Sequence, residues 1–165
     1  TMGEVNPPHM LTDCQPDSEK GKIDALFAQI DWAESTRPDY KETYFRPPLT
    51  LMGSQPGLMQ EWVAYANEWI AAKKVTVKPG AAVTLQDEAC YCALVIQGHG
   101  SFGTFECEAP ELLRWNDLSA DEFFVSEAAA KRGVKIVNTS SYSPLVILQN
   151  FANNNPAVPR KMEKG

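Results

Sequence analysis

Few side chains in this sequence carry obvious chemistry, and the clearest are two neighbouring carboxylates. Asp87 and Glu88 follow an apolar stretch, and a carboxylate pair of this kind can do acid–base work. The same pair also fits a solvated turn between two strands, which is the interpretation we favour. The sequence alone leaves both interpretations open.

Arg114 stands inside the apolar stretch Leu-Leu-Arg-Trp at residues 112–115. An arginine on an inward face needs an anionic partner, because an unpaired buried charge is costly. The partner is either a phosphate or carboxylate of a ligand, or a structural Asp or Glu. We favour the structural pair and keep Arg114 as a candidate ligand-binding residue.

Histidines are too few for a typical transition-metal site, which uses several imidazoles with a carboxylate. His9 lies in a proline-rich stretch, and His99 lies between Gly98 and Gly100, where we expect an exposed hairpin tip. Ser126 is expected to cap a helix rather than act as a nucleophile. We therefore predict no bound metal and no other cofactor.

The cysteines leave two alternatives. A hairpin folded about residues 98–100 would bring Cys107 close to Cys92, so a disulfide between them is conceivable. A domain of this size does not need such a crosslink, and buried free cysteines are common. We predict that the four cysteines are mostly reduced: Cys14, Cys90, Cys92 and Cys107.

Composition narrows the classes of protein. The chain has 165 residues, a net charge of −6 and 44% hydrophobic residues, which is enough for one domain with a real core. An acidic chain is a poor candidate for binding nucleic acid or an anionic membrane. No apolar run reaches the length of a membrane span, and no signal peptide is visible, so we expect a cytoplasmic protein.

Short strands must position the candidate residues. Apolar and β-branched runs separated by turn residues predict mainly β structure, with a miniature helix at residues 126–133 between Ser126 and Gly133. Residues 91–97 and 101–107 are expected to form a hairpin about the glycines. The other predicted strands lie at residues 61–65, 69–77, 83–85, 112–115, 121–125, 134–138 and 144–151.

The N-terminal third reads differently. Apolar residues at helical spacing, Ile23, Leu26, Phe27 and Ile30, predict one short helix that docks on the outside of a sheet. Residues 31–57 are rich in proline and aromatic rings and are predicted to be irregular. We therefore expect an extended N-terminal arm with a short helix over residues 1–60, a β-barrel over residues 61–152 and a flexible tail over residues 153–165.

The strand and turn motifs resemble those of the cupin superfamily. The matching stretches are PGxxV, YxxLVIQGHG, DEFFV and VKIVNTS, which together span about residues 69–151. Residues 111–126 are also similar to the second barrel of bacterial two-cupin proteins. The resemblance implies a jelly-roll barrel, often paired with a second barrel.

The same resemblance shows where this chain departs from the family. Counting back from Gly98, the positions of the family's two histidines and glutamate fall on Leu85, Asp87 and Tyr91. Counting forward from Gly80, the histidine positions fall on Gln86 and Glu88. The last histidine position falls on Val134, so the resemblance implies that the typical metal ligands are missing. Tyr91 then either binds a ligand or fills space in the barrel, and we favour filling.

Two functions follow from these expectations. The first is a metal-independent cupin-like barrel that binds a small, sugar-like ligand or serves as a structural or dimerisation module, as a homodimer or beside a neighbouring cupin domain. The second is a metal-independent isomerase or epimerase acting on a sugar or sugar phosphate. The ligand-binding candidates are Arg114, Tyr91, Gln86, Asp87 and Glu88, and whether the chain is an enzyme stays open.

Overall fold

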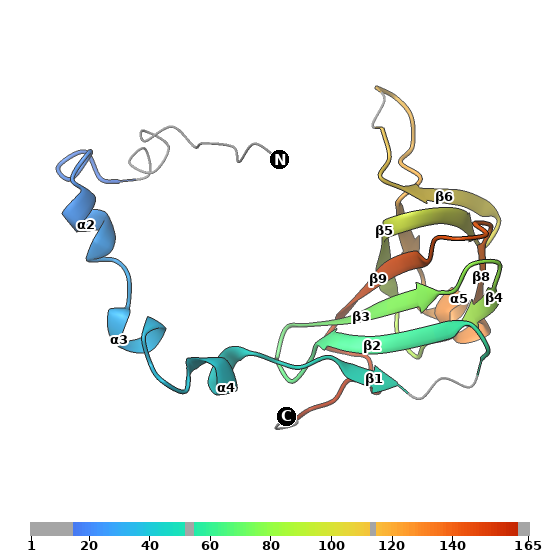
Figure 1. Ribbon diagram of the computed structural model, residues 1–165, viewed down its shortest axis with the longest axis horizontal. Helices are drawn as coiled ribbons and strands as arrows, with labels where there is room; N and C mark the ends of the chain where they lie inside the picture. Colours follow the sequence, from blue (N-terminus) through green and yellow to red (C-terminus); the bar gives the residue numbers. More distant parts are fainter. Residues whose placement is uncertain (1–14, 52–54, 113–114, 162–165) are drawn as a thin grey trace. The chain divides into compact units, whose positions relative to one another are not determined.

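The computed structural model describes residues 15–51, 55–112 and 115–161 (Figure 1). The chain divides into two units between Phe45 and Arg46. The domain boundary expected between residues 60 and 61 would instead cut through strand β2, Leu58–Ala64. The difference arises because residues 46–60 pair into the sheet rather than stay in an arm.

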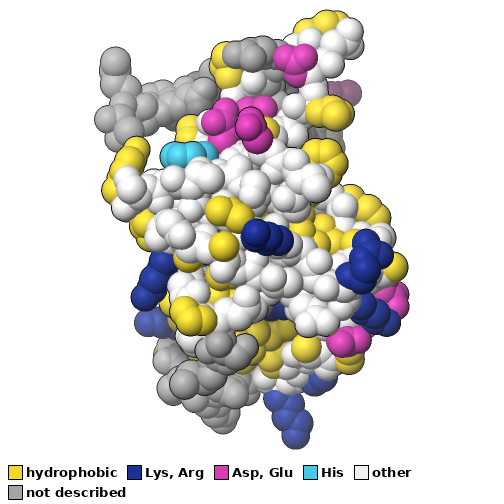
Figure 2. Space-filling view, turned by 90° about the vertical axis from the view of Figure 1, so that its right-hand side faces the viewer, with side chains coloured by type: hydrophobic (Ala, Val, Ile, Leu, Met, Phe, Trp, Pro, Cys, Tyr) yellow, Lys and Arg dark blue, Asp and Glu magenta, His cyan; other side chains and the backbone are white. Residues whose placement is uncertain are grey.

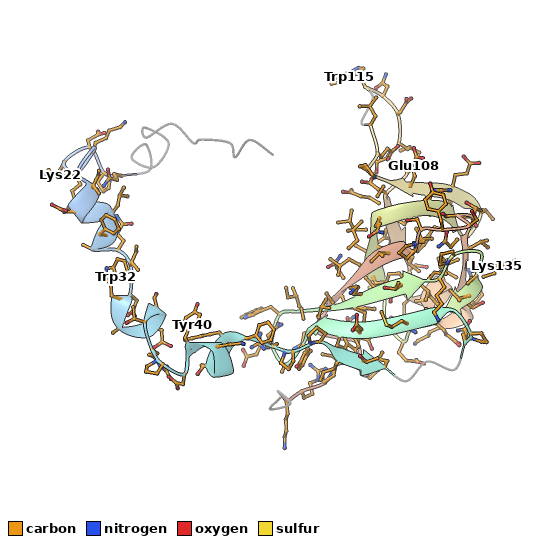
Figure 3. The ribbon with its side chains drawn as sticks, in the orientation of Figure 1. Lys22, Trp32, Tyr40, Glu108, Trp115 and Lys135 are labelled. Carbon is orange, nitrogen blue, oxygen red and sulfur yellow. The ribbon has the colours of Figure 1, made fainter. Side chains whose placement is uncertain are left out.

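The first unit holds three short helices: α2 Ile23–Phe27, α3 Trp32–Ser35 and α4 Tyr40–Tyr44. The sequence predicted one helix and an irregular segment, so α3 and α4 correct that prediction. Asp31 explains the start of α3, because its carboxylate accepts a hydrogen bond from the Glu34 backbone amide at 2.9 Å. Trp32 and Tyr40 open successive helices (Figure 3).

The second unit is a curled antiparallel sheet of nine strands (Figure 1). Its main strand order is β1-β2-β3-β9-β5-β8-β4, and β6 and β7 also pair with β5. No helix among the described residues is long and apolar enough to cross a membrane. Besides β2, the strands are β1 Leu49–Leu51, β3 Ile70–Val77, β4 Ala82–Leu85, β5 Tyr91–Phe102, β6 Phe105–Ala109, β7 Glu122–Val125, β8 Val134–Asn138 and β9 Leu145–Ala152.

Strand β5 holds the sheet together. Its first half pairs with β9 on one side and β7 on the other, and its second half pairs with β6 and β8. A register shift between Val95 and Gln97 marks where the strand passes from one set of partners to the next. This bending closes the sheet toward a barrel, and the mainly all-β jelly-roll architecture predicted from the sequence is confirmed.

The glycines of β5 do not form the predicted hairpin tip. Gly98 and Gly100 lie inside the strand, and the turn to β6 comes later, at Gly103. A side chain on Gly100 would meet the Val137 carbonyl oxygen of β8. These glycines are therefore needed for close approach of neighbouring backbone, and His99 lies on a strand, although it is exposed as predicted.

The same register separates Cys92 and Cys107, for which a disulfide was the less favoured alternative. Cys107 of β6 lies opposite Gly100, whereas Cys92 lies on the first half of β5 between β7 and β9. Cys90, Cys92 and Cys107 are free thiols, and Cys107 is buried. Burial raises the pKa of the Cys107 thiol to about 11, so it stays protonated at neutral pH. Cys14 lies outside the described residues.

Several local predictions are confirmed. Helix α5, Glu127–Arg132, begins after Ser126, whose hydroxyl accepts a hydrogen bond from the Ala129 backbone amide, and it ends at Gly133 with φ of 91°. Strands β7, β8 and β9 fall where they were expected. A strand was predicted at residues 112–115, but Leu112 and Trp115 are not in a strand. Residues 113–114, including Arg114, lie outside the described residues.

The C-terminal tail also differs from its prediction. Residues after 152 were expected to be flexible, yet Asn155 and Val158 are buried. The Pro159 carbonyl oxygen accepts a hydrogen bond of 3.0 Å from the Ala66 backbone amide. The described part of the tail therefore packs against the barrel, although its composition suggested no such contact.

The Asn138 side chain connects three segments at one end of the barrel by hydrogen bonds. It is almost fully buried, and its amide donates to the carbonyl oxygens of Val77 at 3.0 Å and Ser143 at 2.8 Å. Its side-chain oxygen accepts from the Ser140 backbone amide at 2.9 Å. One side chain thus joins the end of β3, the end of β8 and the loop before β9, which accounts for the Asn-Thr-Ser motif.

Replacing Asn138 with alanine is expected to lower the free energy of unfolding by about 2–3 kcal/mol, because it leaves buried backbone groups without partners. Urea unfolding measures this change. The matched control is Asn150→Ala, since Asn150 is exposed and its amide reaches only the Leu148 carbonyl of its own strand, at 3.4 Å. Equal losses of stability in the two variants would contradict this role of Asn138.

Candidate functional site

A buried lysine marks the candidate site. Alternate residues of β3 point into the barrel, so Lys73 shares the inward face with Ala71, Val75 and Val77. Lys73 is only 3% exposed. A buried ammonium needs an anionic partner, because taking a charge out of water costs several kcal/mol.

Asp87 is that partner. It lies in the loop between β4 and β5, and its two carboxylate oxygens lie 2.6 and 2.8 Å from the Lys73 Nζ. The amide nitrogens of Asn155, at 3.1 Å, and Gln149, at 3.4 Å, also donate to this carboxylate. Asp87 therefore accepts four hydrogen bonds, two at each of its carboxylate oxygens.

Strand register explains the neighbours of the pair. Trp62 of β2, Lys73 of β3, Gln149 of β9 and Ala93 of β5 are successive cross-strand partners. The Lys73 Nζ lies 5.2 Å from the ring centroids of both Trp62 and Phe151. These aromatic faces attract the ammonium and stabilise its charge away from water.

Three buried polar atoms beside the pair have no hydrogen-bond partner among the described residues. They are the Tyr91 hydroxyl, the Gln149 side-chain oxygen and the Trp62 indole nitrogen. The Tyr91 ring packs on Phe151 with centroids 5.5 Å apart, and Phe151 packs on Trp62 at 5.8 Å. One hydroxyl, one acceptor and one donor therefore lie around the same aromatic cluster.

Burial sets the protonation of these groups. Desolvation lowers the pKa of the Lys73 ammonium, while the Asp87 carboxylate acts in the opposite direction. Desolvation raises the pKa of the Tyr91 phenol to about 12, although the neighbouring Gln149 side chain acts in the opposite direction, so this hydroxyl is protonated at neutral pH.

The structure brings together only some of the predicted site residues. Tyr91 and Asp87 are buried in the cluster, so the interpretation of Asp87 as part of a solvated turn is wrong. Glu88 and Gln86 are exposed, and the Gln86 amide donates to the Lys131 carbonyl outside the barrel. The carboxylate pair is split because successive residues face opposite ways, and Arg114 lies outside the described residues.

Sequence reasoning missed Lys73, Gln149 and Asn155. A signal existed for the first two, since each is a polar residue at an inward position of an alternating strand. Asn155 gave no such signal, because it lies in a segment without periodicity. Lys73 lies 76 positions before Gln149 and 82 positions before Asn155, so only the folded register brings the three to one place.

The positions at which the resemblance to cupins would place metal ligands do not fit a metal here. Leu85 and Val134 offer no ligand atom, Asp87 is held by Lys73, and Tyr91 is a protonated phenol. Within the described ranges, no group of three or more His, Cys, Asp or Glu side chains is placed to hold a metal ion.

Other charged groups stand on the outside of the barrel. Glu108 of β6 and Lys135 of β8 are exposed (Figure 3). Figure 2 shows acidic side chains gathered in the upper part of one face, near a histidine, and Lys and Arg side chains in its middle and lower parts. The Lys73–Asp87 pair thus differs from these surface charges in being buried.

Comparison with solved structures returns chains of similar fold. An RmlC-like cupin protein from Ralstonia eutropha JMP134 is 6% identical, with a TM-score of 0.45 over 65% of this chain and 63% of that one. Polyketide cyclase RemF from Streptomyces resistomycificus is 12% identical, with a TM-score of 0.46 over 71% and 80% of the two chains. A cupin-2 domain protein from Rhodospirillum rubrum is 13% identical, with a TM-score of 0.46 over 72% and 76%.

The chain spans less than two thirds of the length of the first of these structures. No protein-family model and no curated protein matches the chain. All three TM-scores lie below 0.5, and the likeness concerns the arrangement of strands alone. The chain itself is a curled antiparallel sheet of nine strands, the mainly β architecture that its strand and turn motifs predicted.

Proposed function

We propose that the barrel is a metal-independent binding module that takes a small, uncharged, hydroxyl-bearing molecule beside Lys73 and Asp87. The observation that carries this proposal is the set of three unpartnered atoms on Tyr91, Gln149 and Trp62. Buried polar groups are nearly always hydrogen-bonded, so groups left over in one place need an explanation. Hydroxyls of a ligand, which both donate and accept, can satisfy all three.

Charge favours a neutral ligand. Lys73 and Asp87 are the only buried charged side chains among the described residues, and they neutralise each other. A phosphate or carboxylate would have to compete with Asp87 for Lys73 in a desolvated setting. The rings of Trp62, Tyr91 and Phe151 offer apolar faces suited to the carbon skeleton of a sugar or polyol.

The hydrogen bonding of Asp87 favours binding over isomerase chemistry. A general base must have a carboxylate oxygen that can receive a proton from the substrate. Both Asp87 oxygens are already occupied by Lys73, and Asn155 and Gln149 add further donors. The pair is better suited to hold the walls of a binding site than to transfer protons.

The Tyr91 hydroxyl provides a test without any ligand. Tyr91→Phe is expected to raise the free energy of unfolding by about 1 kcal/mol, because it removes a buried hydroxyl that has no partner. Tyr65→Phe is the matched control, since the Tyr65 hydroxyl donates to the Pro47 carbonyl at 2.8 Å. We expect this control to lose about 1–2 kcal/mol in the same urea titration. Equal destabilisation in both variants would count against the proposal.

Thermal unfolding in the presence of small molecules tests the ligand class. Neutral monosaccharides and polyols, with glucose and inositol as first probes, should raise the melting temperature in a concentration-dependent way, because they bind only the folded state. The effect should be lost in Tyr91→Phe. Glucose 6-phosphate is the charged control.

Metal content is measured on the same preparations by elemental analysis. We expect no iron, zinc, manganese or nickel at stoichiometric level. A chelator-resistant metal, or stabilisation by the phosphorylated probe alone, would contradict the proposal.

We further propose that the first unit docks on a second barrel, either an identical subunit or a neighbouring cupin domain. Several of its apolar side chains are not buried by other residues of that unit; these include Ile23, Phe27, Trp32, Tyr44 and Phe45. Each aromatic ring removes about 150–250 Å² from water when it packs, so leaving them all exposed is unfavourable. The strands at the two ends of the sheet order also have unpaired backbone groups along one edge, and a second barrel could cover these edges.

Removing residues 1–45 tests this assembly without cutting a strand. We expect the full chain to be a dimer at micromolar concentration by light scattering and the truncated chain to be a monomer with a lower melting temperature. A full chain that is monomeric and gains no stability from residues 1–45 would overturn the proposal.

A further inference from the structure

Residues 153–160 follow β9 and pack against two loops at the polar end of the barrel. The Asn153 amide donates to the Glu68 carbonyl at 2.9 Å, and the Pro159 carbonyl accepts from the Ala66 amide at 3.0 Å, both in the β2–β3 loop. Asn155 reaches the Asp87 carboxylate in the β4–β5 loop. The segment thus bridges the loops that flank the Lys73–Asp87 pair.

Asn155 is the inward-pointing member of this segment. It is completely buried, and its amide nitrogen lies 3.1 Å from an Asp87 oxygen. Its side-chain oxygen accepts from the Ala157 amide at 3.0 Å, and its backbone carbonyl accepts from the Val158 amide at 3.2 Å. The tight turn made by these bonds holds the Asn155 amide toward the ion pair and buries Val158 beside it.

Apart from Asn155 and the buried Val158, the contacts of the segment with the barrel are hydrogen bonds at its rim. It pairs with no strand, and the Arg160 guanidinium bonds only to Asn153, within the segment itself. Segments with few buried contacts and solvent-exposed hydrogen bonds open locally at much lower free energy than a sheet does. The Asn155 hydrogen bond, the buried Val158 side chain and two rim hydrogen bonds therefore set the stability of this closure.

We propose that residues 153–160 form a strap that closes the polar end of the barrel, with Asn155 as its latch on Asp87. Opening of the strap is then the route by which molecules reach Lys73 and the unpartnered groups of Tyr91, Gln149 and Trp62. The cluster that the strap closes is the site of the proposed function, but the closure itself does not depend on the identity of a ligand.

Acetylation of Lys73 by a lysine-reactive ester, followed by peptide mass spectrometry, reports the opening. In the unaltered chain Lys73 should react far more slowly than the exposed Lys135. Asn155→Ala should accelerate acetylation of Lys73 roughly tenfold or more, since it removes a hydrogen bond to a charged group. Asn150→Ala is the matched control, because Asn150 lies outside the strap and is exposed, and it should leave the rate unchanged.

Urea separates strap opening from unfolding of the whole barrel. Below the unfolding transition, the rate of Lys73 acetylation should depend only weakly on urea, because a small segment exposes little surface. A urea dependence as steep as that of global unfolding would overturn the strap. Equal rates in the Asn155 and Asn150 variants, or a Lys73 as reactive as Lys135, would overturn it too. The measurement uses no sugar or polyol, so a failed ligand screen would leave its outcome intact.

Discussion

The buried ion pair between Lys73 and Asp87 is the interaction on which the interior of this barrel depends. Removing two charges from water costs several kcal/mol per ion, and their attraction offsets this only when the remaining hydrogen bonds are satisfied. Here the carboxylate gains donors from Asn155 and Gln149, and the ammonium lies against two rings. Four segments, namely β3, the β4–β5 loop, β9 and the C-terminal residues, are fixed to one another by this pair.

The barrel interior is accordingly divided along its strands. Toward one end, alternate residues of β3 and β9 are apolar, with Val75 and Ile147 fully buried as direct partners. Toward the other end, the next inward pair in the same strands is Lys73 and Gln149. The apolar end provides the hydrophobic stabilisation common to such folds. The polar end contributes less hydrophobic stabilisation, and such local departures from apolar packing are typical of functional sites.

Much of the fold could be predicted from the sequence, because periodicity and turn chemistry are local. The cap at Ser126 and the stop at Gly133 depend on their neighbours alone, and they were predicted correctly. The glycines of β5 were assigned to a turn, since a glycine needed for close approach to Val137 looks the same in sequence. Of the site, Asp87 and Tyr91 could be found by counting along the chain, whereas their contacts with Lys73 and Asn155 depend on distant register.

The place of β9 in the sheet has a consequence for synthesis of the protein. This last strand lies between β3 and β5 and is the direct neighbour of both. Until β9 has left the ribosome, β3 and β5 have exposed edges and Lys73 has no Gln149 beside it. Long-range pairing of this kind forms late and leaves unfinished chains prone to association. The nascent chain must therefore stay soluble while the edges of β3 and β5 that will pair with β9 are still open.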